Sequence, residues 1–322
     1  MFLLAVLQYS NTKDHDYAWD DAIVLTENSR VQKGWSNIPE LFENIKTEKT
    51  ENRYGYRPIS LLSFATDVEF FGMDPKASHR INILLYSLLC VLVFYFLNTV
   101  FPDGGWRNFL LTLLFVAHPL HTEVVANIKS RDEILAMIFG LASLLFYRNA
   151  ILGNRTIPMF LLGCLSLILG FHSKESAITF AGVAFLMPLF ILPDLNLKKV
   201  LKSSLPAIGF LAVILAIRAY VYSDSFFEYN DVELLEKGVF HQDGFVGNPV
   251  TDMGFSDRLA MAIFLVIYFL FRFVVPFPLV HDYSYNQLAV HGWSDWQVWI
   301  SIILCIGLGA LIIQGIRKRK HY

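Results

Sequence analysis

Residues 81–101 read INILLYSLLCVLVFYFLNTVF, a run that contains no charged side chain. About 20 predominantly apolar residues are needed to cross the hydrocarbon core of a bilayer, so this run is long enough to form a transmembrane helix. Further apolar runs follow at about residues 109–128, 134–147, 157–171, 177–192, 205–222, 259–280 and 298–316. The sequence therefore predicts an all-α fold, a polytopic transmembrane helical bundle of about eight membrane segments.

The composition of the whole chain agrees with this prediction. Of its 322 residues, 55% are hydrophobic and 17% are charged, and the mean hydropathy is +0.47. A soluble domain has about 45–50% apolar and about 25% charged residues, so a cytosolic enzyme is excluded. The 26 basic and 28 acidic residues leave a formal net charge of -2, which gives no support to a nucleic-acid partner. The expected surroundings are the lipid bilayer.

Polar segments divide the chain, and their charges predict an orientation. The predicted parts are residues 1–9, a partial first transmembrane helix; 10–80, a large first outer loop; 81–222, core transmembrane helices; 223–257, a second outer loop; 258–316, C-terminal membrane segments; and 317–322, a basic tail. Short loops rich in Lys and Arg tend to stay cytoplasmic, and such loops surround Arg107, Arg148 and Lys198. The first loop and the turns at 127–133 and 172–176 then converge on the opposite face. The basic tail is the exception to this pattern.

Asp20 and Asp21 in the first loop are the candidate catalytic residues. They follow Tyr17 and Trp19, and aromatic residues are enriched where a membrane meets water. A carboxylate held at that level can accept a proton from an attacking hydroxyl group. The alternative interpretation is a helix N-cap or a solvated acidic turn.

A second polar group lies between two apolar runs. On a helix, His118 and His121 share one face, and Glu123 and Asn127 share another. Polar groups so close to lipid usually face a cavity, so these side chains are candidates for hydrogen bonding to sugar hydroxyls or to neighbouring helices. A zinc site is the weaker alternative because Pro119 distorts the turn and the spacing suggests no third ligand. No metal ligand is assigned.

Cationic side chains near these groups are candidates for binding a phosphate. The guanidinium of Arg131 offers the two parallel donors that bind phosphate oxygens, and the alternative is a salt bridge to Asp132 or Glu133. Lys174 either neutralises a lipid-linked phosphate at headgroup depth or belongs to a tight turn, and Arg57 is open to both interpretations. The candidate substrate-binding residues are Arg57, His118, His121, Glu123, Asn127, Arg131, Glu133, Lys174 and Glu175.

These residues follow one another in an order typical of one protein family. The matching stretches are Tyr17-Ala-Trp-Asp-Asp21, Tyr56-Arg-Pro58, His79-Arg-Ile-Asn82, Leu114-Phe-Val-Ala-His-Pro-Leu-His-Thr-Glu123, Ser130-Arg131, Ser173-Lys-Glu175 and Asp282-Tyr-Ser-Tyr-Asn-Gln287. From about residue 10 to residue 287 the chain resembles the membrane region of the transmembrane-and-TPR-repeat protein O-mannosyltransferases and their bacterial relatives. Where that family often has Gly-Arg-Ala-Asp, this chain has Asp132 and Glu133 after the arginine, so Glu133 takes the acidic position.

The resemblance implies a GT-C glycosyltransferase fold in which Asp20 and Asp21 are the catalytic pair. It implies inverting transfer of a hexose, mannose in the family, from a polyprenyl- or dolichyl-phosphate sugar to a hydroxyl acceptor, either a protein Ser/Thr or a glycan. The expected location is the bacterial inner membrane or the endoplasmic reticulum membrane, with the active site on the periplasmic or lumenal side. No cofactor is assigned, and a divalent cation stays open.

Two other functions are open: a transporter or flippase for lipid-linked sugars, and a non-catalytic membrane scaffold that keeps the fold. Transporters tend to bind their substrates near the bilayer midplane on broken helices. The ionisable residues here gather at one boundary instead, so the transferase is favoured. The paired aspartates argue only weakly against the scaffold.

Overall fold

The computed structural model describes residues 1–43, 54–153, 156–192, 197–221, 254–280 and 288–318 of the chain. Every regular element among these residues is a helix. The α-helices are α1 (Phe2–Tyr9), α2 (Ser29–Gln32), α3 (Ile38–Leu41), α4 (Pro58–Phe71), α5 (Pro75–Val100), α6 (Gly105–Ala117), α7 (His121–Ala126), α8 (Arg131–Ile151), α9 (Thr156–Ser173), α10 (Thr179–Leu186), α11 (Pro188–Ile191), α12 (Leu197–Val221), α14 (Phe255–Val274) and α15 (Trp296–Lys318). Shorter turns are η1 (Ser10–Asp14), η2 (Ala22–Thr26), η3 (Gly34–Asn37), η4 (Pro102–Gly104) and η5 (Glu175–Ile178).

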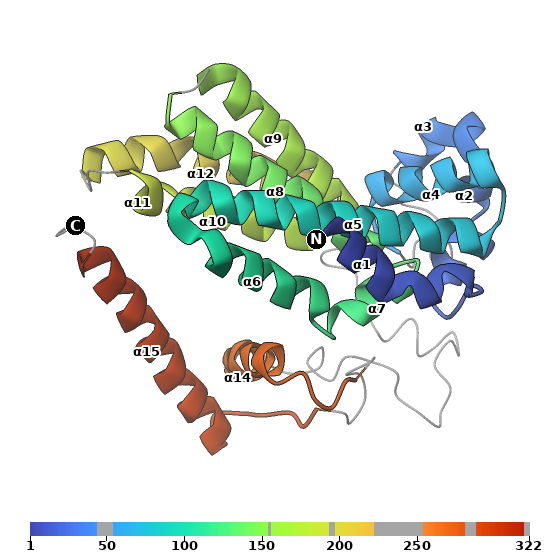
Figure 1. The fold of residues 1–322 in the computed structure, drawn as a ribbon. Helices are drawn as coiled ribbons and strands as arrows, with labels where there is room; N and C mark the ends of the chain where they lie inside the picture. Colours follow the sequence, from blue (N-terminus) through green and yellow to red (C-terminus); the bar gives the residue numbers. More distant parts are fainter. Residues whose placement is uncertain (44–53, 154–155, 193–196, 222–253, 281–287, 319–322) are drawn as a thin grey trace. The chain divides into compact units, whose positions relative to one another are not determined.

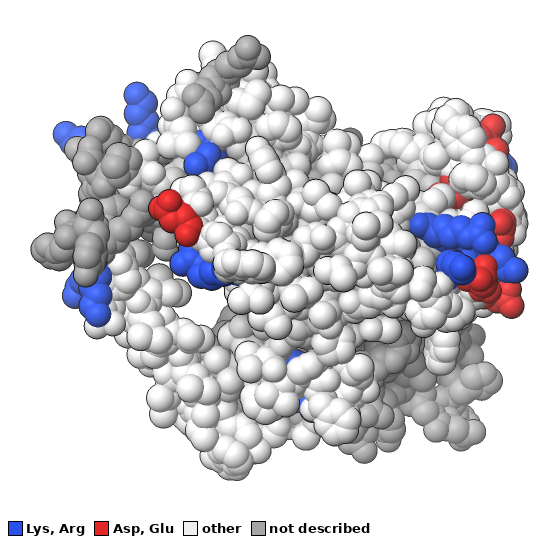
Figure 2. All heavy atoms as spheres, viewed as in Figure 1, with Lys and Arg blue, Asp and Glu red and all other residues white. Residues whose placement is uncertain are grey.

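Four helices in the described part of the chain are long and apolar enough to cross a membrane, namely α5, α8, α9 and α15. The prediction of a polytopic, all-helical membrane protein therefore holds at this level. On α5 the side chains of Leu84, Leu88, Val91 and Tyr95 are 42% to 59% exposed and repeat every third or fourth residue, which forms one apolar stripe. On the face drawn in Figure 2, charged side chains lie toward the two ends of α5, and none covers its middle. Such a surface suits contact with lipid.

Prolines divide two of the predicted membrane segments. The run at 109–128 is predicted as one segment, but α6 ends at Ala117 and α7 begins at His121. Pro119 lies in the gap, and proline lacks the N–H that a helix interior needs and clashes with the preceding turn. The run at 177–192 is divided in the same way before Pro188. Each of these predicted segments is a pair of shorter helices.

The chain forms two compact units, Met1–Ser223 and Asp224–Tyr322. In the first, α5 packs against α1, α6 and α8, and α8 pairs with α9 along most of its length (Figure 1). Gly170 favours the close approach of α9 to α8, because a Cβ atom there would lie only 3.2 Å from Cβ of Phe139 on α8. In the second unit α14 packs against α15. Residues 222–253, most of the predicted second outer loop, and the 282–287 motif lie outside the described residues.

The first predicted outer loop has a hydrophobic core of its own. Val24, Leu25 and Val31 are fully buried against Phe64 of α4. Helices α2, α3 and α4 gather at the N-terminal end of α5, which begins at Pro75 (Figure 1). This packing fixes the backbone that carries Asp20 and Asp21.

Candidate functional site

The segment that joins α7 to α8, residues 127–130, is fixed by two distant parts of the chain. The Asn82 side chain of α5 donates hydrogen bonds to the carbonyl oxygens of Asn127 and Ile128, at 3.2 and 3.3 Å. The backbone N–H of Lys129 donates to Oδ1 of Asp21 at 2.9 Å. This short segment therefore ties the first loop to the beginning of α8.

The two aspartates lie in different environments. Asp21 is 1% exposed, and its second carboxylate oxygen accepts the Ala18 N–H at 3.0 Å. The side chain of Asp20 is 47% exposed, and its Oδ2 lies 3.5 Å from Nζ of Lys129. Immediately before them in the sequence, Trp19 has a φ of 45°. This conformation costs a non-glycine residue energy and persists only where the surrounding structure enforces it. Asp21 anchors the turn, and Asp20 is the carboxylate open to a reactant.

Burial of the Asp21 carboxyl makes the stability of the fold depend on pH. Its burial raises the pKa of Asp21 above the ordinary value, although the N–H groups of Ala18 and Lys129 oppose this rise. A carboxyl with a raised folded-state pKa stabilises the fold fully below its unfolded pKa, about 4, and loses that contribution as pH rises through the folded value. We expect the unfolding midpoint of Asp21→Asn, measured against pH from 4 upward, to lack this decline. A decline of the same size in the variant would contradict the assignment.

Five charged side chains from three segments form a second group, which we name the α8 ion cluster. It consists of Arg57, Asp132, Glu133, Lys174 and Glu175. Nη1 of Arg57 lies 2.7 Å from Oδ2 of Asp132, and Nη2 lies 2.9 Å from Oε2 of Glu175. Nζ of Lys174 lies 2.7 Å from Oε1 of Glu133 and 3.5 Å from Oδ1 of Asp132. Four of the predicted binding residues thus meet, although they come from the first loop, α8 and the turn after α9.

Asp132 is the centre of the cluster. Its side chain is fully buried, and it accepts a further hydrogen bond of 3.1 Å from the hydroxyl of Tyr54. Burial, together with the charge of Asp132, raises the pKa of Tyr54 well above its usual value, so the hydroxyl keeps its proton. The guanidinium of Arg57 also lies over the Tyr54 ring, 4.9 Å from its centroid. Burial alone would lower the pKa of Arg57, but the carboxylates of Glu175 and Asp132 outweigh it and raise that pKa.

Arg131 does not lie where a phosphate clamp requires it. The residue is 0% exposed, and Nη2 lies 2.6 Å from Oδ2 of Asp67 on α4. Nε donates to Asn82 at 2.7 Å, and the guanidinium lies 4.5 Å from the centroid of the Phe64 ring. The alternative of a salt bridge to Asp132 or Glu133 also differs from the structure, because the side chain extends back toward α4 and α5. Arg131 holds three helices together.

His121 contacts α5, and the His118 ring lies beside that of His121 at a centroid distance of 5.6 Å. Nδ1 of His121 lies 2.9 Å from the Tyr86 hydroxyl, and its ring packs on Phe115 at a centroid distance of 4.4 Å. These contacts match the helix-pairing interpretation of His121. Glu123 is exposed on α7. In the part of the chain that the structure describes, no three His, Cys, Asp or Glu side chains are grouped to hold a metal ion.

Sequence reasoning assigned no role to Lys129, Asp67 or Tyr54. Lys129 contacts both aspartates, Asp67 neutralises Arg131, and Tyr54 donates to Asp132. Each partner is far away in the sequence, so no local spacing indicates the contact.

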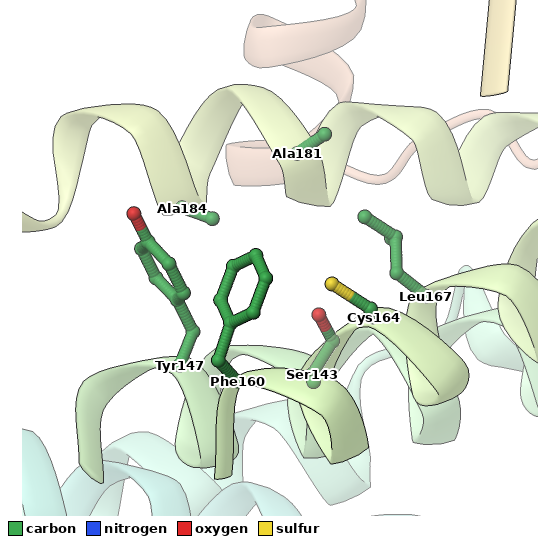
Figure 3. Close-up of a pocket in the computed structure, with 8 residues that line it drawn as sticks. Ser143, Tyr147, Phe160, Cys164, Leu167, Ala181 and Ala184 are labelled. Carbon is green, nitrogen blue, oxygen red and sulfur yellow. The ribbon is translucent and has the colours of Figure 1, made fainter. Parts of the chain in front are cut away.

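A pocket between α8, α9 and α10 differs from the site because its lining is mostly apolar and includes no charged side chain. Figure 3 shows Tyr147, Phe160, Cys164 and Leu167 of α8 and α9 facing Ala181 and Ala184 of α10.

These observations define an all-helical, polytopic membrane protein with a group of paired acidic and basic side chains where its first loop meets α8 and the end of α9. Human protein O-mannosyl-transferase TMTC1 is 31% identical to the chain over 204 residues, which are 58% of this chain and 23% of the relative. Human TMTC2 is 29% identical over 208 residues, 62% of this chain and 25% of the relative. Drosophila melanogaster Tmtc3 is 26% identical over 219 residues, 59% and 24% of the two chains.

The chain is therefore homologous to the TMTC protein O-mannosyl-transferases over about 60% of its length, which confirms the resemblance indicated by its motifs. It spans about a quarter of the length of these relatives. No family model and no solved structure matches the chain.

Proposed function

We propose that the protein is an inverting GT-C glycosyltransferase that moves a hexose, mannose by analogy with its relatives, from a polyprenyl or dolichyl phosphate to a hydroxyl acceptor. The observation that carries this proposal is the arrangement around residues 129–133. The exposed Asp20 carboxylate contacts Lys129, and the α8 ion cluster begins at Asp132. Consecutive Cα atoms are about 3.8 Å apart, so the Cα atoms of Lys129 and Asp132 are within about 11 Å of each other. A carboxylate and several cations therefore share one small region.

Asp20 acts as the general base. The acceptor oxygen attacks the anomeric carbon of the sugar, its proton passes to Asp20, and the bond from the anomeric carbon to the phosphate oxygen breaks. Proton transfer requires Asp20 within about 3 Å of the acceptor oxygen. The hydrogen bonds that Asp21 accepts from the N–H groups of Ala18 and Lys129 support this role, because they fix the turn that carries Asp20.

Lys174 and Arg57 stabilise the charge that grows on the leaving phosphate. Their side chains are 20% and 17% exposed, so an anion can approach them. Fixed cations beside a developing charge lower the barrier. Arg131 serves this step indirectly, since its bonds to Asp67 and Asn82 position α8. The remaining candidates for contacts to sugar hydroxyls are His118, His121, Glu123, Asn127, Glu133 and Glu175.

The relatives are named protein O-mannosyl-transferases, so a protein Ser or Thr is the first acceptor to test, ahead of a glycan. We propose that the site faces the periplasm or the lumen, in the bacterial inner membrane or the endoplasmic reticulum membrane. This side is supported by the basic residues near Arg107, Arg148 and Lys198, which belong to the cytoplasmic loops under the charge rule.

The proposal is tested by incubating the purified protein with a panel of radiolabelled polyprenyl-phosphate and dolichyl-phosphate sugars and Ser/Thr peptides, with and without a chelator. We expect labelled peptide from one donor, with the anomeric configuration inverted. Loss of product with chelator would assign a divalent cation. Absence of product from every donor, with intact labelled lipid carried across a bilayer by the same protein, would replace this proposal with transport.

A further inference from the structure

Lys129 contacts both members of the aspartate pair through different atoms. Its backbone N–H donates to Asp21 at 2.9 Å, and its Nζ lies 3.5 Å from Oδ2 of Asp20. The first bond is buried with Asp21, which is 1% exposed. The second contact is at the surface, since the side chains of Lys129 and Asp20 are 23% and 47% exposed. The backbone of Lys129 is therefore fixed while its ammonium group has room to change partner.

The cations of this region differ in how firmly they are held. Arg57 contacts two carboxylates at 2.7 and 2.9 Å, and Arg131 contacts Asp67 at 2.6 Å inside the protein. Lys174 contacts Glu133 at 2.7 Å and Asp132 as well. Within the described part of the chain, Lys129 forms one ion pair, with Asp20 at 3.5 Å. An exposed pair of this length contributes little, so an incoming anion displaces its carboxylate most easily.

We propose that Lys129 is an exchange cation, which pairs with Asp20 in the free protein and moves to the phosphate of the lipid-linked sugar when that donor binds. The exchange frees the Asp20 carboxylate to face the acceptor hydroxyl. This inference rests on the proposed function for the identity of the anion. It adds a contact to the donor phosphate that the motifs do not assign.

The exchange also fits the charge balance of the transfer. The donor is a phosphodiester with one negative charge, and the product is a phosphomonoester with up to two. The electron pair of the broken bond goes to the phosphate oxygen, and the acceptor proton goes to Asp20. Negative charge thus leaves Asp20 and grows on the phosphate, so an ammonium group on the phosphate stabilises the transition state more than one on Asp20.

Binding of the sugar-free product lipid tests the exchange without catalysis. The probes are radiolabelled undecaprenyl phosphate and dolichyl phosphate in detergent micelles, with the full chain. Lys129→Gln is expected to weaken binding about tenfold, because a charge-assisted hydrogen bond is lost. Asp20→Asn is expected to tighten binding about twofold to fivefold, because Lys129 no longer has to leave a carboxylate. In the Lys129→Gln background, Asp20→Asn should change binding little, since the two sites are coupled.

Matched controls come from the exposed pair of Asp14 and Arg80, which are 3.3 Å apart in the same first-loop region. Asp14→Asn and Arg80→Gln change the net charge by the same amounts and should leave binding unchanged. Tighter binding by Asp20→Asn that persists in the Lys129→Gln background would overturn the exchange, because it would be a general charge effect. Equal affinities of the wild type and both single variants would also overturn it.

Kinetics separate this role from a structural one. Lys129→Arg keeps the charge and should transfer sugar within about tenfold of the wild-type rate, whereas Lys129→Gln should lose about 100-fold in kcat and also raise the donor KM. A folded wild type that transfers sugar, with Lys129→Gln equally active, would remove the inference and leave the proposed function intact. A wild type that neither binds these lipids nor transfers sugar would remove both.

Discussion

Replacement of Asp20 by asparagine is expected to lower the rate of sugar transfer by about 100-fold to 10,000-fold, the range that a general base contributes. The substitution keeps the shape of the side chain but removes its capacity to take a proton. Asp20 is half exposed and its contact is a surface pair, so the variant should fold normally. The measurement is the initial rate with saturating donor and acceptor, beside circular dichroism of the same preparation.

Asp14→Asn is the matched control for this experiment. Asp14 lies in the same loop and is 54% exposed, and its partner is Arg80 instead of Lys129. The control should transfer sugar at the wild-type rate. If Asp20→Asn is folded and as active as the control, Asp20 is not the base.

Arg131→Met is expected to lower the free energy of unfolding by about 3–5 kcal/mol, the cost of breaking a buried ion pair from one side. Arg131 is 0% exposed and Asp67 is 3% exposed, so the variant leaves the Asp67 carboxylate buried without its counter-charge. The Ser78 hydroxyl, which also donates to Asp67 at 2.7 Å, cannot replace a full charge. Unfolding by sodium dodecyl sulfate in mixed micelles, followed by circular dichroism, provides the measurement.

Two further variants test whether that loss comes from the buried ion pair. Arg131→Met combined with Asp67→Leu should recover much of the loss, because an apolar pair of similar volume can replace a buried ion pair. Arg80→Met removes an arginine whose side chain is 59% exposed, and it should lower the free energy of unfolding by about 0–1 kcal/mol. Equal losses for Arg80→Met and Arg131→Met would show that Arg131 does not hold the helices together.

The membrane helices could be predicted from the sequence because their signal is local. The uncharged run at 81–101 forms most of α5, and the runs at 134–147 and 157–171 lie inside α8 and α9. The division of the 109–128 run depends on one residue, Pro119, whose presence predicts a distorted turn but not the end of a helix.

The candidate site could be predicted by residue type better than by role. The grouping of Arg57, Lys174 and Glu175 with α8 agrees with the predicted convergence of loops. The division of labour between Asp20 and Asp21 could not be read from the sequence, because it depends on a bond from Asp21 to Lys129, 108 residues along the chain. The partner of Arg131 is likewise on α4, 64 residues away. Spacing alone favours the neighbouring Asp132 and Glu133 as its partners.

Reconstitution in liposomes can show whether these side chains form a site that breaks the bond between a sugar and a lipid phosphate. The purified protein is supplied with a doubly labelled polyprenyl-phosphate mannose and a Ser/Thr peptide, and both labels are counted in the products. With the wild type and with Asp14→Asn we expect one free polyprenyl phosphate for each mannose on peptide. With Asp20→Asn we expect almost no mannose on peptide. Mannose that stays on its lipid while crossing the bilayer would exclude sugar transfer, and product that forms equally with Asp20→Asn would exclude Asp20 as the base.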